Sequence, residues 1–222
     1  MKKLYINGKI YVDKEHFEES MLISDGIIVA LGTNEELIKH EVDEVVDLLG
    51  KTMLPGLNDS HLHLTMMGDY MNTCNLTSAK SIDEVVGLGK KFLAEHPDTK
   101  VLIGKGWNQN SFQDGERRFI NRHDLDRIST DIPIVFDMVC IHVSVGNTKA
   151  LEILNIDETT KIEGGEIQLG ADGKPNGIFN EGAVKLIQSV IPSKSAEDIS
   201  RDFIRAMDYA VSVGLTSVPS CA

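Results

Sequence analysis

Cysteine is scarce in this sequence, and no two cysteines lie close together. Cys74, Cys140 and Cys221 are odd in number, and none is part of a Cys-x-x-Cys motif. A disulfide framework and a cysteine-bound zinc site are therefore not expected. Long apolar runs are also missing, since no stretch approaches the roughly 18 apolar residues of a membrane helix. The opening MKKLYINGKI has two lysines but lacks the apolar region of a signal peptide. These absences predict a chain of the reducing cytoplasm that has no membrane partner.

Positive charge is in short supply as well. The chain has 22 Lys and Arg against 34 Asp and Glu, a formal net charge of −12, and no basic run. Because an acidic surface repels phosphate backbones, nucleic acid is not expected as a partner. The sequence also lacks the GxSxG turn of serine hydrolases and the GxxxxGK[ST] loop of nucleotide-binding proteins. Neither serine-nucleophile nor P-loop chemistry is therefore predicted.

What is present first is a β-rich opening segment, residues 1–52. Asn7-Gly8 and Asp25-Gly26 each stand between alternating apolar runs, which is typical of a hairpin with a type I′ turn. One short helix is expected in TNEELIKH, capped by Thr33 or Asn34. We predict a first domain of short strands joined by tight turns, without a cluster of catalytic residue types.

From residue 53 onward, predicted strands alternate with predicted helices. The strands are KVLIGKGWN and the apolar run DIPIVFDMVCIHVSVG. One helix is capped by Ser81, and a second, amphipathic one is expected in KSAEDISRDFIRAMDYAVSVG, residues 194–214. A small β insert around 160–182 is predicted to form a hairpin at Asp172-Gly173. Such alternation favours βα units and a parallel sheet, so the predicted class is α/β with a second domain over 53–222.

The stretch TMLPGLNDSHLHL is expected to be a strand that carries chemistry. Asp59, His61 and His63 occupy alternate positions, which on a strand point to one face. Two imidazoles at this spacing can reach one metal ion, and zinc lowers the pKa of bound water to about 7. The alternative is a histidine pair that only makes local hydrogen bonds. Asp59 would either bond a histidine nitrogen or anchor the backbone of a loop.

Five segments, in the same order, resemble one protein family. LPGLNDSHLHL resembles the first barrel strand of the amidohydrolase superfamily, with matches at Leu54, Pro55, Gly56, Leu57, Asp59, His61 and His63. The other four resemble motifs of its YtcJ-like subgroup, amidohydrolase family 3; they are GWNQNSF, RHDLDRISTDIPIVFDMVCIHVSVGNTKALEILNI, GGEIQLGADGKPNGIFNEGA and AVSVGLTSV. The resemblance covers essentially the whole chain.

This resemblance implies part of a (β/α)8 TIM-type barrel beside a small N-terminal β-sandwich. It implies hydrolysis of an amide-type, non-peptide C–N bond of a small molecule by metal-activated water. His61 and His63 would end the first barrel strand and hold a divalent metal, with zinc as the first choice and one or two ions bound. Glu181, in FNEGA, matches a glutamate of the subgroup and would be a further ligand. Its alternative role is a helix N-terminal acid favoured by the dipole.

Three further residues are predicted to bind the substrate: Trp107, Gln109 and His142. For Trp107 and His142 the alternative is a place in the core. The methionines after the histidines, Met66, Met67 and Met71, would form either an apolar pocket wall or core. Cys140 is expected to be a small buried apolar residue.

Several expected parts of the family pattern are missing. No histidine follows His142, and the aspartate that would shuttle the proton has no counterpart, so no catalytic residue is identified. Asn108 stands where the family often has aspartate, Ile141 where glycine is usual, and residues 219–222 differ from the usual motif after the last strand. Two hypotheses remain: a truncated hydrolase, or a non-catalytic fragment that folds by association with partner chains, for instance as a homo-oligomer.

Overall fold

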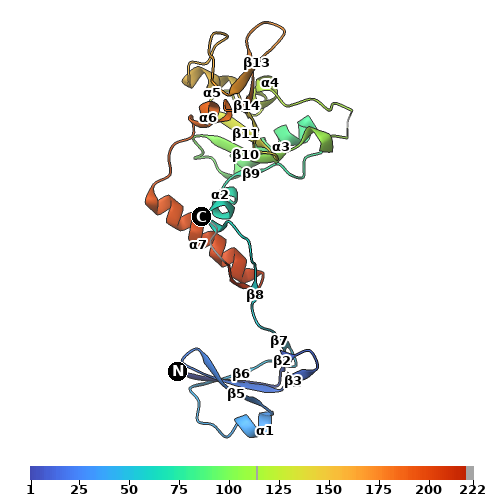
Figure 1. Ribbon diagram of the computed structural model, residues 1–222, viewed down its shortest axis with the longest axis vertical. Helices are drawn as coiled ribbons and strands as arrows, with labels where there is room; N and C mark the ends of the chain where they lie inside the picture. Colours follow the sequence, from blue (N-terminus) through green and yellow to red (C-terminus); the bar gives the residue numbers. More distant parts are fainter. Residues whose placement is uncertain (114, 219–222) are drawn as a thin grey trace. The chain divides into compact units, whose positions relative to one another are not determined.

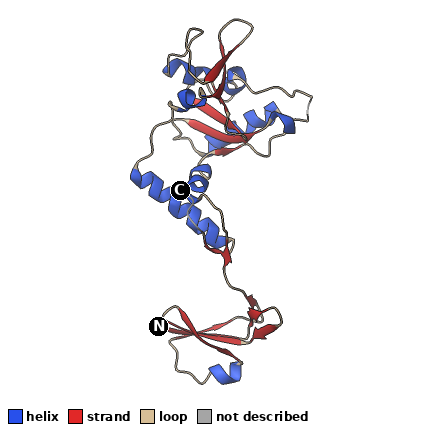
Figure 2. Ribbon diagram, viewed as in Figure 1, coloured by secondary structure: helices blue, strands red, loops and turns tan. Residues whose placement is uncertain are grey.

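The computed structural model describes residues 1–113 and 115–218, a mixed α/β chain with several separate sheets (Figure 2). It forms two compact units (Figure 1). The first contains residues 1–61 and the segment that starts at Ala210, and the second contains residues 62–209. No helix in the described ranges is both long enough and apolar enough to span a bilayer.

Two small sheets form the N-terminal part of the first unit. The four-stranded sheet has the order β5-β4-β1-β6, with bounds Ile27–Gly32, Ser20–Ser24, Lys2–Ile6 and Glu44–Asp47. The three-stranded sheet has the order β3-β2-β7, with bounds His16–Glu18, Lys9–Asp13 and Thr52–Met53. Leu4, Leu22 and Leu37 form the buried cluster of this unit.

The predicted turns of the first unit have different outcomes. Asp25-Gly26 is confirmed as a hairpin turn, since both residues have positive φ and Ser24 pairs with Ile27 across β4 and β5. The hairpin at Asn7-Gly8 is wrong, because β1 pairs with β4 and β6 whereas β2 pairs with β3 and β7. The chain turns at Asn7 and passes from one sheet into the other. Cross-strand burial, and not the turn dipeptide, selects these partners.

The short helix α1, Asn34–Leu37, is capped by Thr33, one of the two expected caps. Thr33 accepts the backbone N–H of Glu36, and the Glu36 carboxylate accepts the backbone N–H of Thr33. This reciprocal capping box satisfies two N–H groups that have no partner inside the helix.

The second unit is organised by a six-stranded mixed sheet, β13-β14-β12-β11-β10-β9. Strands β9, β10 and β11 are parallel, whereas β12, β14 and β13 continue the sheet antiparallel. The bounds are Cys74–Asn75 for β9, Leu102–Trp107 for β10, Ile134–Met138 for β11, Val143–Gly146 for β12, Gly165–Leu169 for β13 and Pro175–Glu181 for β14. The predicted hairpin at Asp172-Gly173 therefore exists, and it extends this sheet at one edge.

Short helices connect the strands of the second unit. They are α2 (Leu64–Tyr70), α3 (Ile82–Glu95), the 3-10 turn η1 (Gln109–Ser111), α4 (Arg122–Asp126), α5 (Thr148–Ile153) and α6 (Val184–Gln188). A longer helix, α7 (Ala196–Ser212), follows them. Ser81 caps α3 as predicted by accepting the Glu84 N–H. The predicted apolar stripe of α3 faces the core, where Ile82 and Val85 are buried.

Asn147 ties two elements of this unit together. Its side chain is fully buried; its amide oxygen accepts the N–H groups of Ile134 and Ala150, and its amide nitrogen donates to two carbonyls, those of Ser129 and Ile132. One residue therefore caps α5 and fixes the start of β11.

The strand that precedes the two histidines lies in a sheet of its own. β8 (Leu57–Asn58) pairs in parallel with β15 (Leu215–Ser217), both in the first unit. Gly56 permits the close approach, because a Cβ there would lie 1.9 Å from Thr216 Oγ1. Among the described strands, those from β9 to β14 form a separate sheet, and β8 pairs with β15. The partial barrel expected after residue 53 remains a prediction.

Candidate active site

The histidine segment is not the strand that the sequence predicts. β8 ends at Asn58, and the chain bends before α2 begins at Leu64. Asp59 Oδ1 accepts the backbone N–H of His61 at 2.9 Å, and His63 occupies the N-cap position of α2. The aspartate thus anchors loop backbone, the second of its two expected roles. A side chain that binds the backbone two residues on favours a turn over a strand ladder.

Consequently, alternation along a strand does not describe the placement of Asp59, His61 and His63. Both histidines are exposed at the carboxyl end of β8. Metal binding by this pair remains a prediction that rests on their spacing and the family resemblance.

Glu181 makes a different contact from the predicted one. It ends β14 with φ +52, and its Oε2 lies 3.0 Å from His142 Nδ1. Within residues 1–113 and 115–218, no three His, Cys, Asp or Glu side chains gather so as to hold a metal ion. Zinc sites use three or four protein ligands. The described residues therefore do not fit a complete metal site, and the two histidines are at most a part of one.

A pocket of about 830 Å³ lies within the second unit, at the carboxyl ends of β10 and β11. Its lining includes Met66, Met67 and Met71, so these methionines form a pocket wall, which is one of the two places expected for them. Val139, Ile141 and Val184 add aliphatic surface. His142 and Glu181 also line the pocket. His142 is exposed and is therefore not a core residue, and its contact with a substrate remains a prediction.

An ion pair forms another part of the pocket lining. Lys105 Nζ on β10 lies 2.6 Å from Asp69 Oδ2 on α2, and Lys194 Nζ lies 2.6 Å from Asp69 Oδ1. Burial by itself would raise the pKa of Asp69, but the hydrogen bonds from the two lysines outweigh burial and lower that pKa from its usual value. The positive charge of Lys105 is thereby paired with Asp69.

The loop between β11 and β12 carries backbone strain beside His142. Ile141 has φ +59 and is 71% exposed. A β-branched residue in this left-handed region is a backbone outlier. The preceding Cys140 is exposed, so the expectation that it is buried is wrong. The apolar run that contains them is two antiparallel strands with a tight turn, and the turn brings both side chains to the surface.

Asp137 on β11 is a pocket residue that the sequence analysis missed. It lines the pocket but is only 7% exposed. Its Oδ1 accepts hydrogen bonds from Ser144 Oγ at 2.5 Å and Gln188 Nε2 at 3.1 Å. The available signal is an aspartate in the middle of an otherwise apolar buried run, since aspartate is rarely buried without a partner.

Trp107 occupies the core, the alternative to substrate contact. It is 0% exposed, its Nε1–H donates to the Phe136 carbonyl at 3.2 Å, and its ring meets Phe119 edge-on at 5.7 Å between centroids. Gln109 begins η1, and in the described structure its Oε1 is buried without a hydrogen-bond donor. Its predicted substrate contact remains a prediction. The altered motif at residues 219–222 lies outside the described residues.

Comparison with known proteins supports the family resemblance. A family model described as "Amidohydrolase family" matches residues 44–222. The chain is 31% identical to the amidohydrolase YtcJ of Bacillus subtilis (strain 168), over 97% of this chain and 42% of that protein. It is 30% identical to the N-substituted formamide deformylase of Arthrobacter pascens, over 90% of this chain and 38% of that protein.

A solved structure is similar to this chain in both sequence and fold. It is an uncharacterized metal-dependent hydrolase from Pyrococcus horikoshii OT3, with a TM-score of 0.69, 29% identity, and coverage of 98% of this chain and 42% of that one. The chain thus spans about two fifths of the length of the relatives it matches. On the match over residues 44–222 and the identity to YtcJ, this chain belongs to the amidohydrolase family.

Proposed function

We propose that this chain is part of a metal-dependent amidohydrolase that cleaves a non-peptide C–N bond of amide type. The supporting observation is family membership together with a histidine pair at the carboxyl end of β8. A divalent metal accords with the P. horikoshii neighbour, which is described as a metal-dependent hydrolase. Zinc is our first choice of metal, since two histidines are suitable zinc ligands.

In this proposal His61 and His63 supply two of the metal ligands. A bound metal would supply hydroxide at neutral pH and polarise the carbonyl. β8 and β15 would be two neighbouring parallel strands of a (β/α)8 barrel, which places the histidines at the end of the strands where barrel active sites lie. Glu181 is the further proposed ligand, and its Oε2 lies 3.0 Å from His142 Nδ1.

The proposed substrate is an N-substituted formamide or a related small amide. The A. pascens relative supports this choice through its name, N-substituted formamide deformylase. In the second unit, the methionine-lined pocket offers apolar surface for an N-substituent, and His142 offers a polar contact beside it.

A second candidate is a non-catalytic fragment that folds by association with further copies of this chain. Exposed apolar side chains favour it. Ile27, Ile28 and Val29 are more than half exposed on the edge strand β5, and so are Ile204 and Val211 on α7. Unpaired strand edges and exposed apolar surface promote association.

Metal content and turnover test the enzymatic proposal. Because the described residues supply only two ligands, we expect the purified chain to bind added zinc weakly, and His61→Ala and His63→Ala to weaken that binding further. His16→Ala is the matched control, because that imidazole is bonded to Glu18 on β3. Hydrolysis of an N-substituted formamide should follow metal content. A chain that binds no added zinc at any pH, or whose zinc binding survives both substitutions, would refute the ligand assignment.

A further inference from the structure

Asp137 is a buried carboxylate without a cation. Its side chain lies on β11 inside the second unit and is 7% exposed. Among the described residues, no Lys, Arg or His nitrogen lies within salt-bridge distance of it. Removing a charge from water is costly unless hydrogen bonds and an opposite charge compensate. The fold supplies the hydrogen bonds but not the charge.

The hydrogen bonds leave one face of the carboxylate open to the pocket. Ser144 and Gln188 both donate to Oδ1. In the described structure no donor lies on Oδ2, and Asp137 is part of the pocket lining. The two neutral donors fix the orientation of the carboxylate from two elements, β12 and α6.

The other charged groups of the lining do not compensate Asp137. Lys105 is bonded to Asp69 at 2.6 Å, and His142 lies 3.0 Å from Glu181. Lys185, on α6, lines the pocket but is exposed, and its charge is hydrated. The remainder of the lining is mainly apolar, with Met67 and Met138 as examples.

We propose that this pocket binds an organic ammonium ion with an apolar body, whose N–H group donates to Asp137 Oδ2. A charge-assisted hydrogen bond to a preoriented carboxylate favours the cation over a neutral analogue. The methionines suit a body of variable shape, because their thioether side chains are flexible and polarizable. A volume of about 830 Å³ lies within the range of small-molecule pockets.

This inference deepens the proposed function and rests on it in one respect. Hydrolysis of an N-alkyl amide releases an alkylamine, which is protonated at neutral pH. The pocket would hold that product, or the same cationic group on a substrate. Binding itself needs neither metal nor turnover, so the two proposals can fail separately.

Calorimetric titration tests the inference with two probes of nearly equal shape. We expect the full chain, in the presence of a chelator, to bind 2-phenylethylammonium roughly tenfold more tightly than the neutral 2-phenylethanol, the value of one charge-assisted hydrogen bond. Asp137→Asn keeps an oxygen for Ser144 and Gln188 and removes the charge. It should bring the two affinities within about threefold of each other.

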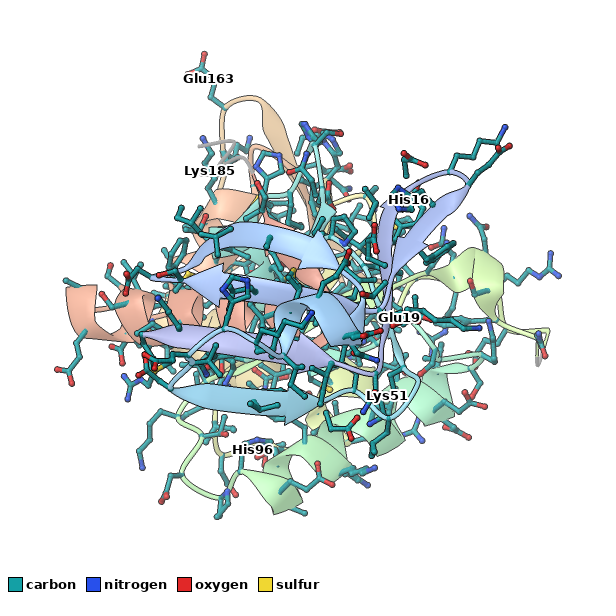
Figure 3. All side chains as sticks on the ribbon, turned by 90° about the horizontal axis from the view of Figure 1, so that it is seen from below. His16, Glu19, Lys51, His96, Glu163 and Lys185 are labelled. Carbon is teal, nitrogen blue, oxygen red and sulfur yellow. The ribbon has the colours of Figure 1, made fainter. Side chains whose placement is uncertain are left out.

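Glu163→Gln is the matched control, since it removes one negative charge at an exposed position. Figure 3 shows Glu163 projecting outward, and it does not line the pocket. The control should keep the preference for the ammonium ion. Equal affinity of the unmodified chain for both probes, or an unchanged preference in Asp137→Asn, overturns the inference. If Asp137→Asn does not fold, the comparison of the two probes on the unmodified chain still decides.

Should the chain bind the ammonium ion selectively but hydrolyse no amide with metal bound, only the proposed function fails. Should it hydrolyse an amide but prefer the alcohol, only the ammonium site fails.

Discussion

Trp107→Phe separates a core role from a substrate role at a residue where the sequence allows both. Trp107 is the only tryptophan of the chain and is 0% exposed at the end of β10. Phenylalanine retains a ring that can meet Phe119 but removes the N–H group that donates to the Phe136 carbonyl. It also leaves space that the smaller ring does not fill.

Two losses set the size of the effect. The indole has three more side-chain heavy atoms than the phenyl ring, and their burial together with the residual cavity is worth about 2 kcal/mol. The carbonyl that loses its donor adds about 1 kcal/mol, the lower end for a buried unsatisfied group. We therefore expect Trp107→Phe to lower the free energy of unfolding by about 3 kcal/mol. In a unit of this size that corresponds to a fall in Tm of about 6–12 °C.

Thermal unfolding followed by far-ultraviolet circular dichroism measures the shift. Tryptophan fluorescence of the unmodified chain reports the same unit, because the only indole lies inside it. The control is Phe17→Leu, at a half-exposed position on β3 of the first unit, which should change Tm little. A Tm unchanged by Trp107→Phe, combined with loss of substrate turnover, would refute the core assignment and restore the substrate role.

Three further substitutions test other parts of the second unit. Asn147→Ala removes four hydrogen bonds, two of them buried and two partly buried, and should cost about 3–5 kcal/mol of unfolding free energy in a urea titration. A loss below about 1 kcal/mol would contradict its bridging role. Burial would raise the pKa of Asp69, but the hydrogen bonds from Lys105 and Lys194 outweigh burial and lower it from its unfolded value of 3.8. The stability that the Asp69 carboxylate contributes is therefore fully present above pH 3.8 and is lost as the pH falls through the lower, folded pKa. In Asp69→Asn, the urea concentration at the unfolding midpoint should therefore decrease less steeply below about pH 4 than in the unmodified chain. The same pH dependence in both proteins would contradict the role of the Asp69 pKa. Ile141→Gly relieves about 1–2 kcal/mol of left-handed strain and should leave the protein as stable or up to about 1 kcal/mol more stable, whereas Ile141→Ala should bring no gain.

Elements set by local chemistry were predictable from the sequence. Helix α3 has its cap at Ser81 and its apolar residues at helical spacing, and the structure shows both. The capping box of Thr33 and Glu36 and the turn at Asp25-Gly26 are likewise fixed within a few residues. In each case the side chains that define the element lie next to it in sequence.

Features that depend on distant partners were not predictable in the same way. The Asn7-Gly8 dipeptide has the composition of a hairpin turn, yet β1 and β2 find their partners in two different sheets. The histidine segment alternates like a strand, but the strand ends early, and the His61 N–H donates a hydrogen bond to the Asp59 carboxylate in the loop that follows. Alternation fixes which residues share a face only if the chain remains extended.

The pocket could not be predicted because a turn in an apolar run has no sequence signal. The run IVFDMVCIHV is apolar enough for a single buried strand, and nothing in it marks the turn at Ile141, because glycine is absent there. The structure turns the chain at that point and pairs β11 with β12, which brings Ser144 opposite Asp137. A pocket carboxylate thus arises from a pairing that periodicity alone does not show.

The residues that carry the metal proposal and the ammonium proposal belong to different sheets. His61 and His63 follow β8, whose partner in the described chain is β15, whereas Asp137 belongs to the mixed sheet of the second unit. A substitution that removes metal should therefore leave the preference for an ammonium ion intact, and Asp137→Asn should leave metal content intact. If instead either substitution abolishes both properties while the fold is retained, metal and ammonium ion are bound by one coupled site, and assigning them to separate sheets is wrong.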